Sequence, residues 1–151
     1  SLKKIKTISV SRSEAKRNRA LDFGAQYSFA PQNAVDEIKN ITEGLGADLV
    51  VDTTGDPDGI TQALNLVKSR GTIACKTTSG LPATGIDMTK LVVDEITLQG
   101  SRCGPFKPAL EIIQVHQEKL KSLITSTRPL EETQAALEST TKENKVVLSI
   151  N

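Results

Sequence analysis

The sequence predicts an α/β fold in which a doubly wound parallel sheet carries helices on both faces. Short segments rich in β-branched residues alternate with segments of about a dozen residues whose apolar side chains recur every three or four positions. Glycine and proline separate many of these segments. The chain has 151 residues, enough for one hydrophobic core and too few for two, so we expect residues 1–151 to form a single domain.

The first elements are predicted by clustered β-branched residues and by capping residues. Residues 5–10 should form a strand, and residues 27–30 a short second strand. Between them Ser13 is the predicted N-cap of a helix. Gly24 suits the left-handed position that follows the last turn of that helix.

A second helix and a buried strand should follow. The helix carries apolar side chains three or four positions apart, at Val35, Ile38, Ile41 and Leu45. It should stop at Gly44 or Gly46, where glycine can end it. Residues 47–51 then form a nearly continuous apolar run, typical of a parallel strand covered on both faces. We expect this strand in the interior of the sheet.

The same alternation continues to the end of the chain. A helix is predicted by the spacing of Ile60, Ala63, Leu64 and Val67, and it should close near Gly71. Further strands are expected at residues 72–75, 96–98 and 146–150. Further helices are expected at residues 88–93, 108–120 and 130–139. Strands and helices in this order predict βαβ units.

Composition argues against several classes of partner and compartment. Nineteen Lys+Arg nearly balance eighteen Asp+Glu, and aromatic residues make up 3%, so a nucleic-acid partner is not expected. No apolar run approaches the roughly 20 residues that span a bilayer, so a membrane partner is not expected either. The two cysteines, Cys75 and Cys103, form no CxxC pair. A reducing, cytoplasmic compartment is the default expectation.

Several segments carry a family resemblance in the correct order. They are residues 6–12, 20–25, 47–55, 70–73, 95–101, 123–125, 129–131 and 145–148. Together they resemble the cofactor-binding half of the medium-chain, zinc-type alcohol dehydrogenases. The resemblance covers nearly the whole chain and implies a Rossmann-like fold. It also implies an oxidoreductase that passes a hydride between a nicotinamide and an alcohol or carbonyl.

One family motif is absent, and its absence leads to a geometric expectation. The glycine turn GxGxxG, which receives the cofactor's pyrophosphate, does not occur in this sequence. By the resemblance, Ser1–Lys4 would be the last residues of the helix after that turn, and the first strand of the sheet would be missing. The strand at residues 5–10 and the strand at residues 47–51 would then flank a gap of about 10 Å.

Three arrangements could fill that gap. The flanking strands could close up, a strand of another copy could enter, or the missing segment could belong to a separate chain. Because unpaired strand edges associate readily, we expect self-association into an oligomer in any case. The chain alone should not catalyse, and no catalytic residue is assigned.

Residues near the first predicted strand favour one cofactor over another. Dinucleotide folds usually end this strand with an acid that binds the ribose, but Ser11 and Arg12 stand here instead. Arg12, with Lys16 one turn further on, would attract a 2′-phosphate. We therefore expect NADP(H) to be favoured over NAD(H). The alternative is that both cations are only solvated surface charges.

Further cofactor-binding residues are expected at the ends of later strands, because ligands of such sheets bind beyond the strands' carboxyl ends. The candidates are Thr53, Thr54, Gly55, Thr77 and Thr78. The alternative is that these threonines only cap turns. The resemblance adds Ser101, Arg102 and Cys103 near the nicotinamide and Lys145 near the pyrophosphate. Lys76 stands where the family usually has an apolar residue, and a solvated side chain is expected there.

A zinc site is not expected. Zinc needs three protein ligands and water, or four ligands, and the spacing of Cys75, Cys103 and His116 matches neither arrangement. His116 is expected on the polar surface of a helix, and Cys103 as a buried, inert thiol rather than a reactive one. Two functions stay open: the NADP(H)-binding part of a dehydrogenase, and a non-enzymatic oligomerisation or binding module. A flavodoxin-like or response-regulator domain is disfavoured because Asp52 alone makes no acidic cluster.

Overall fold

The computed structural model describes residues 5–150. The expectation for Ser1–Lys4 therefore lies outside the described residues. The chain divides into two compact units, Ser1–Arg102 and Cys103–Asn151. All paired strands are parallel and helices lie between them in sequence, so the α/β fold class is confirmed. That the whole chain forms one domain stays a prediction.

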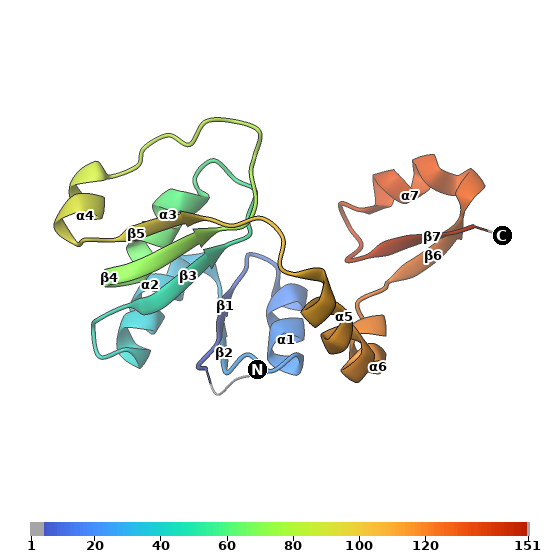
Figure 1. The fold of residues 1–151 in the computed structure, drawn as a ribbon, viewed down its shortest axis with the longest axis horizontal. Coiled ribbons are helices and arrows are strands. Elements are labelled where there is room, and N and C mark those ends of the chain that lie inside the picture. The colour runs from blue at the N-terminus through green and yellow to red at the C-terminus, as the bar shows by residue number, and fades with distance from the viewer. Residues whose placement is uncertain (1–4, 151) are drawn as a thin grey trace. The chain divides into compact units, whose positions relative to one another are not determined.

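The first unit begins with a two-stranded parallel sheet (Figure 1). β1 (Ile8–Val10) pairs with β2 (Tyr27–Phe29), and α1 (Glu14–Asp22) connects them. The predicted cap is confirmed, because Ser13 Oγ accepts a hydrogen bond from the Lys16 N–H at 3.4 Å. Gly24 follows the helix with φ of 103°, the left-handed conformation predicted for it.

A three-stranded parallel sheet contains the main core of the first unit (Figure 1). Its order is β3 (Ala47–Asp52), β4 (Val67–Cys75) and β5 (Thr97–Gly100). α3 (Gly59–Leu66) and α4 (Met88–Val93) form the crossovers. The core cluster consists of Ala63, Leu64, Val67, Ile73 and Ile96. It joins α3 to the middle strand, where Ile73 is fully buried.

The interior position expected for residues 47–51 is wrong. β3 is an outer strand of its sheet, and among the described residues no strand pairs with its other side. Leu49 and Val51 are accordingly 55% and 49% exposed. β1 belongs to the other sheet, so the arrangement in which the two flanking strands close up is not found.

Two helices of the first unit end earlier than expected. α2 (Pro31–Ile41) stops before the glycines because Thr42 Oγ1 donates to the Ile38 carbonyl and accepts the Gly46 N–H. Leu45 consequently lies outside the helix and is 70% exposed. α3 ends at Leu66, and Val67 begins β4 instead of completing the helical stripe. Val67 is nevertheless buried in the same core as the apolar side chains of α3, so its apolar character matched the spacing expected for the helix.

The second unit has a smaller sheet and several short helices. β6 (Ser126–Pro129) pairs with β7 (Val146–Ser149), and a 3-10 turn (Leu130–Glu132) and α7 (Thr133–Ser139) connect them. The single helix expected at residues 108–120 is wrong, since α5 (Phe106–Val115) and α6 (Gln117–Lys121) are separate. His116 breaks them with a non-helical ψ of 23°. Over residues 5–150, no helix has the length and apolarity needed to cross a bilayer.

Candidate functional site

Most of the predicted residues of the first unit follow the ends of β3, β4 and β5. We call residues 53–55, 76–78 and 101–102 the strand-end site. The parallel ladder continues one residue into it on each side of β4. The Lys76 N–H donates to the Asp52 carbonyl at 2.9 Å, and the Ser101 N–H donates to the Cys75 carbonyl at 3.0 Å. The three segments therefore leave the sheet side by side.

Hydrogen bonds made by side chains connect these segments to one another. Gly55, with φ of 65°, turns its N–H toward Thr77 Oγ1 and donates at 3.0 Å. Lys76 Nζ donates to Ser101 Oγ at 3.3 Å and also to the Arg102 carbonyl. The expectation of a solvated Lys76 side chain is wrong, because this side chain is only half-exposed and bridges the ends of β4 and β5. Hydrogen bonds thus connect all three strand ends.

Asp52 organises the turn after β3, a role that the sequence-based candidates missed. Its carboxylate is almost buried, with 8% of the residue exposed. Asp52 Oδ1 accepts hydrogen bonds from the Thr54 N–H at 2.9 Å and from Thr54 Oγ1 at 2.8 Å. A Cβ on Gly59 would lie 2.6 Å from Asp52 Oδ2. An aspartate before Thr-Thr-Gly is the signal that could have revealed this turn.

A hollow of about 230 Å³ adjoins the strand-end site. Asp52, Ile60, Cys75, Thr77 and Thr78 are among the residues that line it. Burial raises the pKa of the Cys75 thiol, and the charge of Asp52 raises it further. The thiol form is therefore favoured, and Cys75 is a poor nucleophile and a poor metal ligand.

The predicted phosphate-binding residues follow β1 in the two-stranded sheet. Ser11 Oγ accepts the Ser13 N–H at 3.3 Å, so it belongs to the turn that starts α1. Arg17, which the sequence did not single out, donates through Nη1 to the carbonyls of Ser11 and Arg12 at 2.7 and 3.0 Å. The side chains of Arg12 and Lys16 are exposed and form no ion pair among the described residues. The role of these two side chains toward a phosphate stays a prediction.

Two of the predicted residues lie in the second unit. Cys103 is exposed, so the expectation that its thiol is buried is wrong. Lys145 is exposed, and its backbone bridges to Thr125, whose N–H donates to the Lys145 carbonyl at 2.9 Å. The roles of Cys103 and Lys145 toward a cofactor stay predictions.

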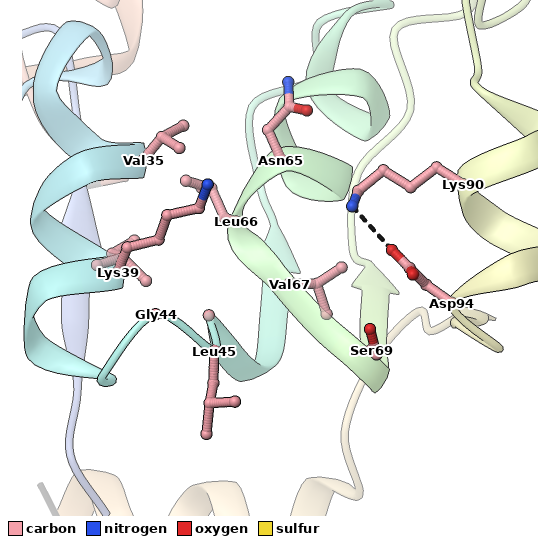
Figure 2. A pocket seen from close by; sticks show the side chains of 12 residues that line it. Val35, Lys39, Gly44, Leu45, Asn65, Leu66, Val67, Ser69, Lys90 and Asp94 are labelled. Atoms are coloured by element: carbon pink, nitrogen blue, oxygen red, sulfur yellow. Dashed lines mark hydrogen bonds and ion pairs between the residues drawn. The ribbon is translucent and has the colours of Figure 1, made fainter.

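A second hollow, of about 270 Å³, lies near the beginnings of β3 and β4 (Figure 2). Lys90 Nζ pairs there with Asp94 Oδ2 at 2.8 Å, and this hydrogen bond is the main reason that the pKa of Asp94 is lowered. Lys39 extends along the same wall without an ion-pair partner in the described part of the chain. The hollow is at the end of the strands opposite to the strand-end site, so it contributes nothing to that site.

The donor atoms of the described residues do not fit a zinc centre. Within residues 5–150, no three His, Cys, Asp or Glu side chains gather as metal ligands. Burial raises the pKa of the Cys75 thiol, which opposes the thiolate that zinc requires.

Comparisons with known proteins identify relatives of this chain. A family model described as zinc-binding dehydrogenase matches residues 2–117. An L-threonine 3-dehydrogenase of Caldanaerobacter subterraneus subsp. tengcongensis is 35% identical over 88% of this chain and 41% of that protein. A D-arabinose 1-dehydrogenase (NADP(+)) of Saccharolobus solfataricus is 26% identical over 82% of this chain and 35% of that protein.

A solved structure has a similar fold. The alcohol dehydrogenase from Thermus sp. ATN1 superposes with a TM-score of 0.86 over 97% of this chain and 44% of that chain, at 20% identity. This likeness supports the Rossmann-like fold. The chain spans 31–43% of the length of the curated relatives that it matches.

Proposed function

The chain belongs to the zinc-binding dehydrogenase family, and we propose that it is the cofactor-binding part of an NADP(H)-dependent, alcohol dehydrogenase-like oxidoreductase. The observation that carries this proposal is the strand-end site. Hydrogen bonds connect the three segments that follow the carboxyl ends of its parallel strands. Open α/β sheets bind their ligands beyond these strand ends.

Each half of the cofactor has candidate partners in the first unit. The exposed cations Arg12 and Lys16 would hold the adenosine 2′-phosphate, and Arg17 fixes the backbone that carries Arg12. The strand-end site would hold the nicotinamide end, with small hydroxyl side chains at Thr54 and Thr77. When bound, the nicotinamide would supply the hydride acceptor or donor of the reaction.

We propose that this chain alone does not catalyse. Next to the strand-end site, the carboxylate of Asp52 accepts hydrogen bonds from Thr54, and Cys75 has a raised pKa. Neither is suited to moving a proton to or from a substrate oxygen at neutral pH. We therefore assign no substrate-polarising group to the described residues.

Calorimetric titration with NADPH and with NADH tests the function and the cofactor preference together. We expect NADPH to bind more tightly, and Arg12→Glu to weaken NADPH binding by at least about tenfold, because it replaces a charge-assisted bond by repulsion. NADH affinity should change far less. Lys39→Glu is the matched control, since it makes the same charge change away from the site. Equal affinities for the two cofactors would contradict the preference, and binding of neither would contradict the function.

The unpaired side of β3 supports a second candidate, self-association as a binding module. Its outer edge has no paired strand among the described residues, and Leu49 and Val51 are about half exposed. Such an edge can pair with another copy. We expect concentration-dependent association in light scattering, weakened by Val51→Lys and unaffected by Arg12→Glu. A monomer at all concentrations would exclude this module.

A further inference from the structure

The Lys76 ammonium is a positive charge at the strand-end site that no carboxylate neutralises. Both of its acceptors, Ser101 Oγ and the Arg102 carbonyl, are uncharged. No ion pair involves Lys76 within the described part of the chain. The Asp52 carboxylate accepts from Thr54 and the Asp56 carboxylate from the Asp58 N–H, and neither carboxylate forms an ion pair with Lys76. A cation without an ion-pair partner in the described part of the chain therefore lies between the ends of β4 and β5.

The two forms of a nicotinamide differ in charge on the ring itself. The oxidised ring is a cation, and the reduced ring is neutral. A fixed ammonium near this ring repels the oxidised form and leaves the reduced form unaffected, and the repulsion is strong where water is partly excluded. The Lys76 side chain is half-exposed, and two hydrogen bonds hold its ammonium group beside Ser101 and Arg102.

We propose that Lys76 is a specificity-determining residue that makes the strand-end site select the reduced cofactor over the oxidised one. This inference rests on the proposed function, because it places the nicotinamide at the strand-end site. It adds a preference for one redox state, which favours substrates that accept a hydride, such as carbonyl compounds.

A purely structural role for Lys76 has a different signature. Its hydrogen bonds hold Ser101 and Arg102 beside β4, and their loss would weaken the binding of both redox forms together. A charge effect instead changes the ratio of the two dissociation constants. The measurement that separates the two roles is therefore the Kd for NADP⁺ divided by the Kd for NADPH.

The experiment titrates the full chain with NADP⁺ and with NADPH by calorimetry at fixed ionic strength. We expect the wild-type ratio to exceed one, and Lys76→Met to lower it by about tenfold through loss of the repulsion. Lys76→Arg keeps the charge and should keep most of the ratio. Lys39→Met is the matched control, because it removes an unpaired lysine from the opposite end of the strands and should leave the ratio unchanged.

A second measurement uses the wild type alone, in case Lys76→Met fails to fold. Raising the salt concentration screens charge repulsion, so the ratio should fall toward one. If both forms bind and the ratio changes neither with salt nor in Lys76→Met, the inference is overturned while the proposed function stands. If neither form binds to the wild type, the proposed function fails and the inference fails with it.

Discussion

The sheets of the two units are stabilised by different means. The three-stranded sheet of the first unit packs on α3 through a cluster of buried apolar residues, with Ile73 fully buried at its centre. Among residues 103–150, Ala136 is the one buried hydrophobic residue. Around β6, Arg128 instead pairs with Glu143 at 3.1 Å and with Glu132 at 3.8 Å. The stability of the three-stranded sheet should therefore depend mainly on apolar packing, and that of the sheet in the second unit on ion pairs.

Removing the centre of the apolar cluster should have the largest effect. Ile73→Ala leaves a cavity where the side chain is 0% exposed, and we expect it to lower the free energy of unfolding by about 2–5 kcal/mol. Urea denaturation of the first unit, followed by hydrogen exchange of the β4 amides, measures the loss. Leu98→Ala is the matched control, because Leu98 pairs with Ile73 in register but is 42% exposed. Equal losses in both variants would contradict the packing model.

A smaller loss of stability is expected where the start of α3 packs against the nearly buried carboxylate of Asp52. In Gly59→Ala the new Cβ would lie 2.5 Å from Thr54 Oγ1 and 2.6 Å from Asp52 Oδ2. The side chains of Asp52 and Thr54 must shift, which disturbs their hydrogen bonds, and we expect a loss of about 1–3 kcal/mol in urea denaturation, although alanine favours helix. Gly104→Ala is the control, since a Cβ there meets nothing within 4 Å. Unchanged stability in Gly59→Ala would show that Asp52 does not constrain this glycine.

The smallest expected effect is on the pH dependence of the second unit. The Ser126 hydroxyl, which donates to the Glu143 carboxylate, is the main cause that lowers the pKa of Glu143, and Arg128 lowers it further. A lowered folded-state pKa stabilises the unit above the ordinary glutamate value of 4.5, and this stability is lost as pH falls through the folded value.

Ser126→Ala should therefore reduce the stability of the second unit near neutral pH and flatten its pH dependence below about pH 5. Hydrogen exchange of the β6 and β7 amides at several pH values measures this change. Thr127→Ala, at the next and exposed position of the strand, is the control. An unchanged pH dependence in Ser126→Ala would contradict the role given to Glu143.

Local chemistry made part of the fold predictable. Ser13 and Gly24 act at the two ends of α1 as their residue types predict, and β-branched residues mark β1, β3 and β7. The errors in helix boundaries arose where the same local sequence pattern is compatible with two different structures. Val67 continues a helical spacing but begins β4, and Thr42 ends α2 before the expected glycine through a side-chain hydrogen bond. Neither outcome is encoded in apolar spacing.

The candidate site was predictable to a similar extent. The general rule for strand ends led to Thr53–Gly55 and Thr77–Thr78, and the structure connects Gly55 to Thr77. The contacts of Lys76 with Ser101 and Arg102 span 25 and 26 positions in the chain, so they depend on the register of β4 and β5. Residue type alone does not show such a contact.

The hydrogen bonds across the strand ends have a thermodynamic consequence for ligand binding. Gly55 and Thr77 on one side, and Lys76 and Ser101 on the other, already hold their segments together in the free chain. A ligand that binds there need not order these loops, so the entropy cost of binding should be small. The heat capacity change should then reflect the apolar surface that the ligand covers, with little contribution from folding of the protein.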